Sequence, residues 1–181
     1  MCASLSESAE DTRAERTTRD LSHDFGPIEL AAGKGSVEVG EIDDVERPVK
    51  IRAKGKAPSF VRHDGDVLSL SAGPVYSLVA HYASLSRRTL DVDLRALSQR
   101  EDEWTIRLPA GMKVLRAPSP SQLDSPFGRF SVAFEEAPGK VTVKTALSFK
   151  KARITPAEYP AWRSFCEAVD RAFGQRMTLG K

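Results

Sequence analysis

Short segments in which apolar and polar residues alternate recur along most of this chain, and they constrain its fold more than any other feature. From Phe25 onward, Gly, Pro and Asp bound these segments at intervals of about 8–12 residues, a spacing typical of antiparallel strands. The two clearest are RTLDVDLRAL, with Leu90 and Val92, and DEWTIRLPAG, with Trp104 and Ile106. We therefore expect a mainly β chain, an antiparallel two-sheet β-sandwich of roughly seven to ten strands with one C-terminal α-helix.

Further alternating segments predict strands on both sides of this region. SVEVGEI and PVKIRAKG place Val37 with Val39, and Val49 with Ile51, on faces that we expect to be half-buried. Asp64-Gly65 lies between two apolar runs and predicts a hairpin tip. The turn APGK joins the last two strands, FGRFSVAFEE and GKVTVKTALSF. The segment between Gly73 and Arg88 fits neither period, and we treat it as a loop with room for a short helix.

The C-terminal segment predicts a helix over about residues 156–174. Thr155 and Glu158 have the spacing of a capping box, and Pro160 predicts an irregular first turn. The helix has an apolar stripe opposite a charged face; the stripe comprises Trp162, Phe165, Cys166, Val169 and Phe173, and the charged face Arg163, Glu167, Asp170 and Arg171. We expect the stripe to pack on a sheet.

Cys166 raises the question of a nucleophilic thiol. A reactive thiol needs a lowered pKa, which usually comes from a helix N-terminus or a histidine partner. Cys166 instead lies in the middle of the predicted helix among aromatic residues, where free cysteine behaves as a small buried hydrophobe. We therefore expect a core residue. Cys2, at the opposite end of the chain, indicates no disulfide framework.

The other candidates for chemistry favour structural interpretations. The three histidines, His23, His63 and His81, lack metal-ligand spacing. GKGS at residues 33–36 lacks the spacing of a phosphate loop, and Ser125 lacks a nucleophile elbow. Adjacent carboxylates are interpreted as solvated charge at Asp43-Asp44, Glu101-Asp102-Glu103 and Glu135-Glu136. The sequence therefore predicts no catalytic, cofactor-binding or metal-ligating residue, and no cofactor.

Composition bounds the size of the core and the class of partner. The 181 residues, 40% of them hydrophobic, suffice for one sizeable core. A formal charge of +2, from 27 basic and 25 acidic residues, argues against a nucleic-acid partner. Residues 1–22 are polar and predict a disordered tail, which leaves residues 23–181 as a single domain. The sequence contains neither an apolar signal-peptide core nor a membrane span, which predicts a cytoplasmic location by default.

The segment that begins at EDEWTIRLPAGMKV and continues from SPFGRF to QRMTL resembles the C-terminal region of bacterial transglutaminase-like proteins. The shared signatures are a Leu-Pro-x-Gly strand end, a Phe-Gly turn, a hairpin and a Pro-x-Glu-Tyr helix start, at Leu108 to Gly111, Phe127-Gly128 and Pro156 to Tyr159. The resemblance covers about residues 88–181. In that family an N-terminal β-rich domain of unknown function precedes a papain-like core with a Cys-His-Asp triad, and the proteins are often exported. Because nothing here matches the triad, the resemblance transfers no catalytic residue.

These observations lead to the hypothesis of a non-catalytic accessory module with a structural or protein-interaction role. The partners to expect are a transglutaminase-like core protein or another protein domain. Two alternatives remain open. One is a non-covalent binding module for peptide or glycan, which contiguous exposed apolar surface around PVYSLVAHYASL would favour. The other is a detached subunit of a transglutaminase-like cysteine enzyme.

Overall fold

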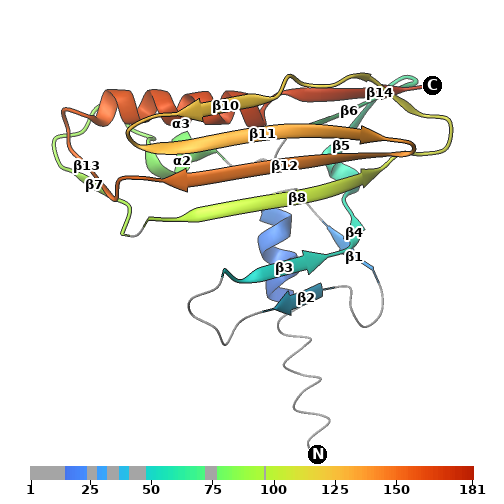
Figure 1. Ribbon diagram of the computed structural model, residues 1–181, viewed down its shortest axis with the longest axis horizontal. Helices are drawn as coiled ribbons and strands as arrows, with labels where there is room; N and C mark the ends of the chain where they lie inside the picture. The colour runs from blue at the N-terminus through green and yellow to red at the C-terminus, as the bar shows by residue number, and fades with distance from the viewer. Residues whose placement is uncertain (1–14, 24–27, 32–36, 41–47, 72–76, 96) are drawn as a thin grey trace, which may run out of the picture. The chain divides into compact units, whose positions relative to one another are not determined.

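The computed structural model describes residues 15–23, 28–31, 37–40, 48–71, 77–95 and 97–181 (Figure 1). Contacts between residues divide the chain into two compact units, Met1–Val61 and Arg62–Lys181. The described strands before residue 57 pair only with one another, in two separate ribbons. The single domain expected from residue 23 onward stays a prediction.

The first unit contains a helix and two short ribbons. Residues 15–23 are helical, in a stretch for which the sequence predicts disorder, and residues 1–14 of the predicted tail lie outside the described residues. The ribbons pair β1 (Glu29–Leu30) with β4 (Gly55–Lys56) and β2 (Val37–Gly40) with β3 (Lys50–Ala53), and the 3-10 helix η1 (Pro58–Phe60) follows. Val49 and Ile51 are 58% and 55% exposed, so the prediction that they are half-buried is wrong. Two strands alone bury few side chains.

A long four-stranded antiparallel sheet forms one layer of the second unit (Figure 1). Its strands, in spatial order, are β10 (Ser121–Asp124), β11 (Gly128–Ala137), β12 (Lys140–Phe149) and β8 (Gln99–Arg107). The β11–β12 hairpin confirms the predicted turn, in which Gly139 has a φ of 72° that a side chain would disfavour. One face of this sheet carries the buried side chains Phe130, Val132, Val141 and Val143.

A second antiparallel sheet combines strands from distant parts of the sequence. Its order is β5 (Val61–Asp64), β6 (Val67–Ser71), β14 (Arg176–Gly180) and β9 (Lys113–Arg116). The predicted hairpin tip is confirmed, because Gly65 has a φ of 60° between β5 and β6. Strand β14 follows the C-terminal helix and was not predicted from the sequence. Its Met177 and Leu179 are buried in the core.

The strand predicted around Leu90 is wrong in its extent. Only β7 (Val92–Asp93) is a strand; it pairs with β13 (Arg153–Ile154), and Leu90 is 77% exposed. The Asp93 carboxylate accepts a hydrogen bond of 2.7 Å from the backbone N–H of Arg95, and Arg95 has a φ of 62°. This local turn ends the extended backbone after two residues.

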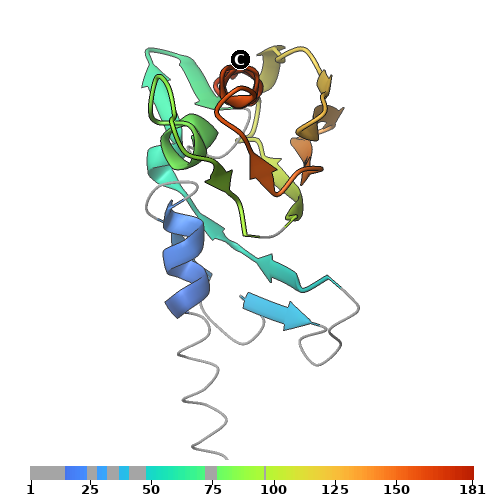
Figure 2. The same ribbon diagram turned by 90° about the vertical axis from the view of Figure 1, so that its left-hand side faces the viewer.

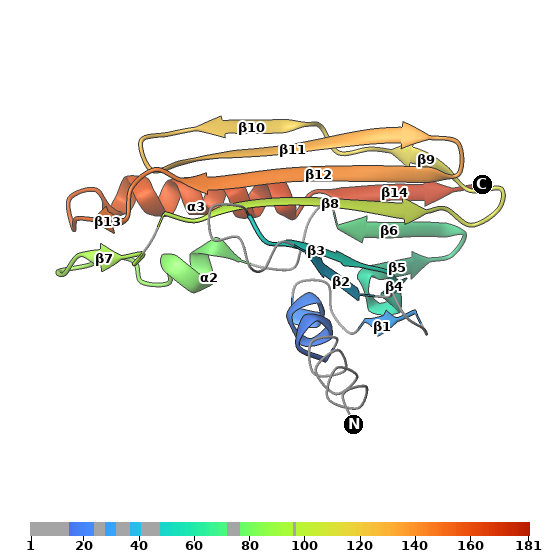
Figure 3. The same cartoon turned by 60° about the horizontal axis from the view of Figure 1, so that its bottom comes forward.

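Two helices complete the second unit. The short α2 (Leu78–Tyr82) lies in the segment for which we expect a loop with room for a short helix, and α3 (Tyr159–Phe173) confirms the predicted C-terminal helix. All five residues of its apolar stripe are buried. In Figures 1 and 3, α3 and the β14 sheet lie end to end behind the long sheet, so a helix supplies part of the second layer. The end-on view in Figure 2 shows α3 between the strands of the two sheets.

Aromatic rings join α3 to the long sheet. The Trp162 ring lies 5.5 Å from that of Phe149 and 5.9 Å from that of Phe127, centroid to centroid. Further along the helix, Phe130 and Phe173 are 5.0 Å apart. All three contacts are edge-to-face, the arrangement that the ring quadrupoles favour. These contacts place the core of the second unit between α3 and strands β11 and β12.

Candidate functional site

Cys166 occupies the core, as predicted from its place in the helix. Its side chain is fully buried, and burial, followed by the nearby Asp170 carboxylate, raises the pKa of the thiol to about 12. A thiol with such a pKa is protonated at neutral pH and is a poor nucleophile. Cys2 lies outside the described residues.

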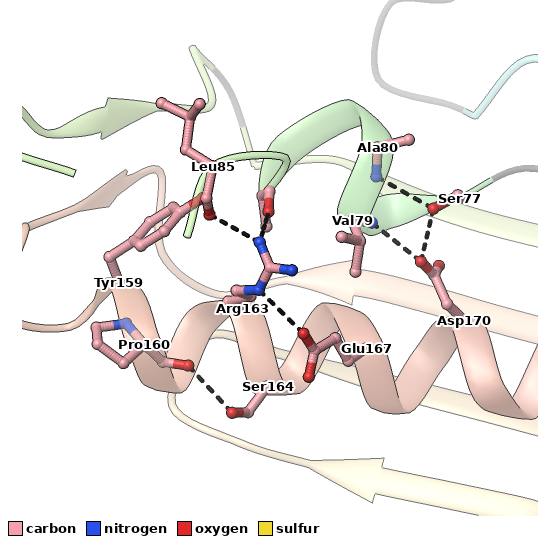
Figure 4. A network of polar contacts seen from close by, with 11 residues as sticks. Ser77, Val79, Ala80, Leu85, Tyr159, Pro160, Arg163, Ser164, Glu167 and Asp170 are labelled. Carbon is pink, nitrogen blue, oxygen red and sulfur yellow. Dashed lines mark hydrogen bonds and ion pairs between the residues drawn. The ribbon is translucent and has the colours of Figure 1, made fainter. Parts of the chain in front are cut away.

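The charged face of α3 forms hydrogen bonds with the start of α2. The Asp170 carboxylate accepts hydrogen bonds from the Ser77 hydroxyl at 2.7 Å and from the Val79 backbone N–H at 3.1 Å (Figure 4). It also accepts from the Leu78 N–H at 2.7 Å. The Ser77 hydroxyl oxygen accepts from the N–H of Ala80, as an N-cap does. Asp170 and Ser77 therefore satisfy the start of α2 and fasten it to α3.

The segment after α2 is fastened in the same way. Arg163 donates from one Nη atom to the backbone carbonyls of Ala83 and Leu85, each at 2.7 Å, and from Nε to Glu167 at 3.0 Å (Figure 4). The Tyr159 hydroxyl also donates to the Leu85 carbonyl, at 2.7 Å. These polar groups satisfy backbone and one another, and their roles are structural. The sequence pattern predicts only that Arg163 and Asp170 lie on the charged face opposite the apolar stripe.

This docking bears on the apolar-surface hypothesis for PVYSLVAHYASL. In the described part of that segment, residues 77–85, Leu78 and Ala83 are fully buried, whereas Leu85 is half exposed. A single exposed leucine is ordinary on a protein surface. Of the other apolar residues described in this segment, Val79 and Tyr82 are half-buried and Ala80 is exposed.

The other residues that the sequence offers as candidates for chemistry lie in different elements of the structure. His23 ends the helix of residues 15–23, His63 lies in β5 rather than at the hairpin tip, and His81 packs against Tyr82 in α2, with ring centroids 4.6 Å apart. Among the described residues, no three His, Cys, Asp or Glu side chains gather as metal ligands would. GKGS, at residues 33–36, and Asp43-Asp44 lie outside the described residues.

Ser125 organises a turn. Its hydroxyl accepts from the N–H groups of Phe127 and Gly128 and donates to the Gly128 carbonyl, each at 3.2 Å. The carboxylates of the long sheet form surface ion pairs, with Asp102 bonded to Arg100 at 2.7 Å and Glu135 to Lys144 at 2.7 Å. Each of these groups has a local structural partner.

Strand β8 is one of the two edge strands of the long sheet. It comprises nine residues at one edge and pairs on one side with β12; no other described strand pairs with it. Glu101 and Glu103 are exposed on the face opposite Trp104 and Ile106. Glu103 lies 4.0 Å from Lys144. This edge offers main-chain donors and acceptors flanked by acidic side chains.

A groove on the second sheet brings together residues that sequence reasoning missed. It encloses about 470 Å³ and is lined by Ser69, Arg116, Ala117, Pro118, Ser119, Gln175, Arg176 and Thr178. Arg116 pairs in register with Thr178, whereas Arg176 precedes Thr178 by two positions and is on the same strand face. The alternation of Met177 and Leu179 could have signalled the strand, but no local pattern indicates its neighbours.

No described helix is both long and apolar enough to cross a membrane. Residues 68–179 match the family described as "Domain of Unknown Function with solved-structure structure (DUF3858)". No curated protein matches the chain. Among solved structures, it is similar to a "putative protease" from Parabacteroides distasonis, with 20% identity and a TM-score of 0.48, over 59% of this chain and 22% of that one. Because the family match covers more than half of its residues, the chain belongs to the DUF3858 family.

Proposed function

We propose that the chain is a non-catalytic accessory module that binds a protein partner through the free edge of β8. The carrying observation is the position of this strand, nine residues long at the edge of the long sheet and bonded on one side by β12. An added strand can form main-chain hydrogen bonds along such an edge without any preformed pocket.

The charges on β8 supply selectivity. Charged side chains on an edge strand discourage indiscriminate pairing, and like charges directly opposite each other destabilise a strand pair. Glu101 and Glu103 would repel an acidic strand and attract one with Lys or Arg at the facing positions. The preferred partner segment is therefore extended and basic.

The chemistry of the thiol supports a non-catalytic role. Cys166 is fully buried and its pKa is raised to about 12, so it lacks the activation that a cysteine nucleophile requires. The resemblance of residues 88–181 to transglutaminase-like proteins makes a separate chain carrying the papain-like core the first partner to test.

The binding test uses charge reversal at the edge. Purified chain is titrated by calorimetry into a separately expressed transglutaminase-like core protein. We expect Glu101→Lys combined with Glu103→Lys to weaken binding at least about tenfold. The matched control reverses two carboxylates of β11, which β12 separates from β8, Glu135→Lys with Glu136→Lys, and should retain the affinity. Equal weakening by both variants, or no binding by the wild type, would count against the edge.

A second measurement separates module from enzyme. The chain alone should show no transamidation or amide hydrolysis, and mass spectrometry should find Cys166 unlabelled by a thiol reagent until denaturant is added. Turnover by the pure chain that disappears in Cys166→Ser would replace the module hypothesis with an enzyme. A rate increase in the core protein when the chain is added would instead favour the detached-subunit alternative.

A further inference from the structure

The groove on the second sheet has an unusual charge pattern. Its lining contains two arginines, Arg116 and Arg176, together with polar and small residues, and no carboxylate. Neither arginine forms an ion pair with any of the residues that the structure describes, whereas Arg100, Arg129, Arg153 and Arg163 all do. Two guanidinium groups that line one groove repel each other, and a bound anion would offset that repulsion.

The register of the strands places both arginines on one face. Arg116 of β9 lies opposite Thr178 of β14, and Arg176 is two positions from Thr178 along the same strand. Diagonal neighbours of this kind have Cα atoms about 7–8 Å apart, within reach of long side chains. The neighbouring Met177 is fully buried on the opposite face, which orients Arg176 away from the core. The two guanidinium groups can therefore approach the same ligand.

Arg176 is held in position before any ligand arrives. Its Nε donates to the Ser69 hydroxyl at 2.6 Å and one Nη donates to the Ser69 carbonyl at 2.8 Å. A guanidinium has five N–H donors, so about three remain for a ligand. Ser69, Ser119, Gln175 and Thr178 add polar side chains to the lining. The donors of Arg176 are thus oriented before a ligand binds, which lowers the ordering cost of binding at that residue.

We propose that this groove binds an oxyanion, the carboxylate or phosphate group of a small molecule, between Arg116 and Arg176. The volume of about 470 Å³ falls in the range of small-molecule sites. The guanidinium group is planar, and its paired N–H donors can form two parallel hydrogen bonds to two oxygens of either a carboxylate or a phosphate. This site is on a different sheet from β8, and the inference does not rest on the proposed function.

The test uses the full chain with inorganic phosphate and malonate as separate probes, each against sodium chloride at equal ionic strength. Binding is followed by NMR, through the Nε–H resonances of the arginines. We expect saturable shifts at Arg116 and Arg176, and at least about a tenfold weaker Kd in Arg116→Ala. Arg107→Ala removes the same charge from the end of β8 and should leave the Kd unchanged.

The outcomes separate the ligand class from the site itself. Saturation by phosphate alone, or by malonate alone, would identify the group that the groove prefers. Arg176→Lys keeps the positive charge but loses the paired donors of the guanidinium group, and it should raise the Kd while the protein remains folded. Shifts no larger than those with chloride, or equal losses in Arg116→Ala and Arg107→Ala, would overturn the proposal.

Discussion

Strand β12 and the β2–β3 ribbon carry the same alternation of apolar and polar residues but differ in what covers them. Val141 and Val143 of β12 are fully buried, whereas Ile51 of β3 and the preceding Val49 are more than half exposed. In β12 the apolar face meets the second layer of its own unit. In the ribbon, each of the two four-residue strands pairs with no described strand except the other. Alternation therefore selects a face, and a second layer turns that face into a core.

The largest contrast should come from introducing the same charge in both places. Val143→Asp would bury a carboxylate without a partner and should cost about 3–5 kcal/mol of unfolding free energy. Ile51→Asp should change it by less than about 0.5 kcal/mol, because the side chain already meets solvent. Urea unfolding followed by far-ultraviolet circular dichroism measures both. Similar losses for the two variants would show that the ribbon also has a covered face.

Substituting alanine for one glycine in each region compares how tightly the long sheet and the ribbon are packed. A Cβ on Gly128 would lie 2.5 Å from the Ser148 carbonyl oxygen and 3.1 Å from Cζ of Phe165, whereas a Cβ on Gly40 of β2 would meet nothing within 4 Å. We expect Gly128→Ala to cost about 2 kcal/mol through overpacking. Gly40→Ala should be neutral or stabilise slightly, because it restricts the unfolded chain. Thermal unfolding would test this, and a harmless Gly128→Ala would contradict the tight packing beneath α3.

Polar contacts support the second layer as well as apolar ones. Asp170→Ala removes the acceptor of three hydrogen bonds at the start of α2 and should cost about 1–2 kcal/mol. Hydrogen exchange should speed up first at the Leu78 and Val79 amides. The control Glu167→Ala, which loses a partly exposed i,i+4 ion pair with Arg163, should cost less than about 0.5 kcal/mol. Equal effects would remove the special role of Asp170.

The smallest effect concerns the surface charges where α3 begins. A hydrogen bond from Lys151, followed by bonds from the Thr155 N–H and hydroxyl, lowers the pKa of Glu158 from 4.5 to about 2. Because the folded-state pKa is the lower one, Glu158 stabilises the fold above pH 4.5, and this contribution disappears as the pH falls toward 2. The urea midpoint of Glu158→Gln should therefore decline less than that of the wild type between pH 6 and pH 3. Parallel declines would contradict the lowered pKa.

Local signals predicted the elements whose partners lie nearby in sequence. The hairpin turn at Gly139 and the apolar stripe of α3 follow from residue type and spacing within a few positions. The irregular helix start also follows: Glu158 accepts from Thr155 as a capping box requires, although the regular helix begins only at Tyr159. The segment after Val92 shows the limit, because the strand that alternation favoured there ends at Asp93, whose side chain accepts from the Arg95 N–H.

Features assembled from distant segments were not predictable in this way. Arg176 and Ser69 are 107 positions apart, and no spacing rule connects them. The groove depends on the register of β14 with β9, which is set by the whole sheet. Asp170 is a similar case, because its helical spacing predicts a charged face and gives no sign of the bonds to α2. The buried character of Cys166, by contrast, followed from its helical neighbours alone.

The central position of β14 has a consequence for the order of assembly. The β11–β12 hairpin joins two strands that are consecutive in the sequence, and it can close within microseconds. Strand β14, by contrast, must pair with β6, which precedes it by about a hundred residues. Loop-closure entropy opposes that pairing until other contacts have brought the ends together. The second sheet should therefore close late, after α3 has docked on the hairpin and carried its last residues to the gap between β6 and β9.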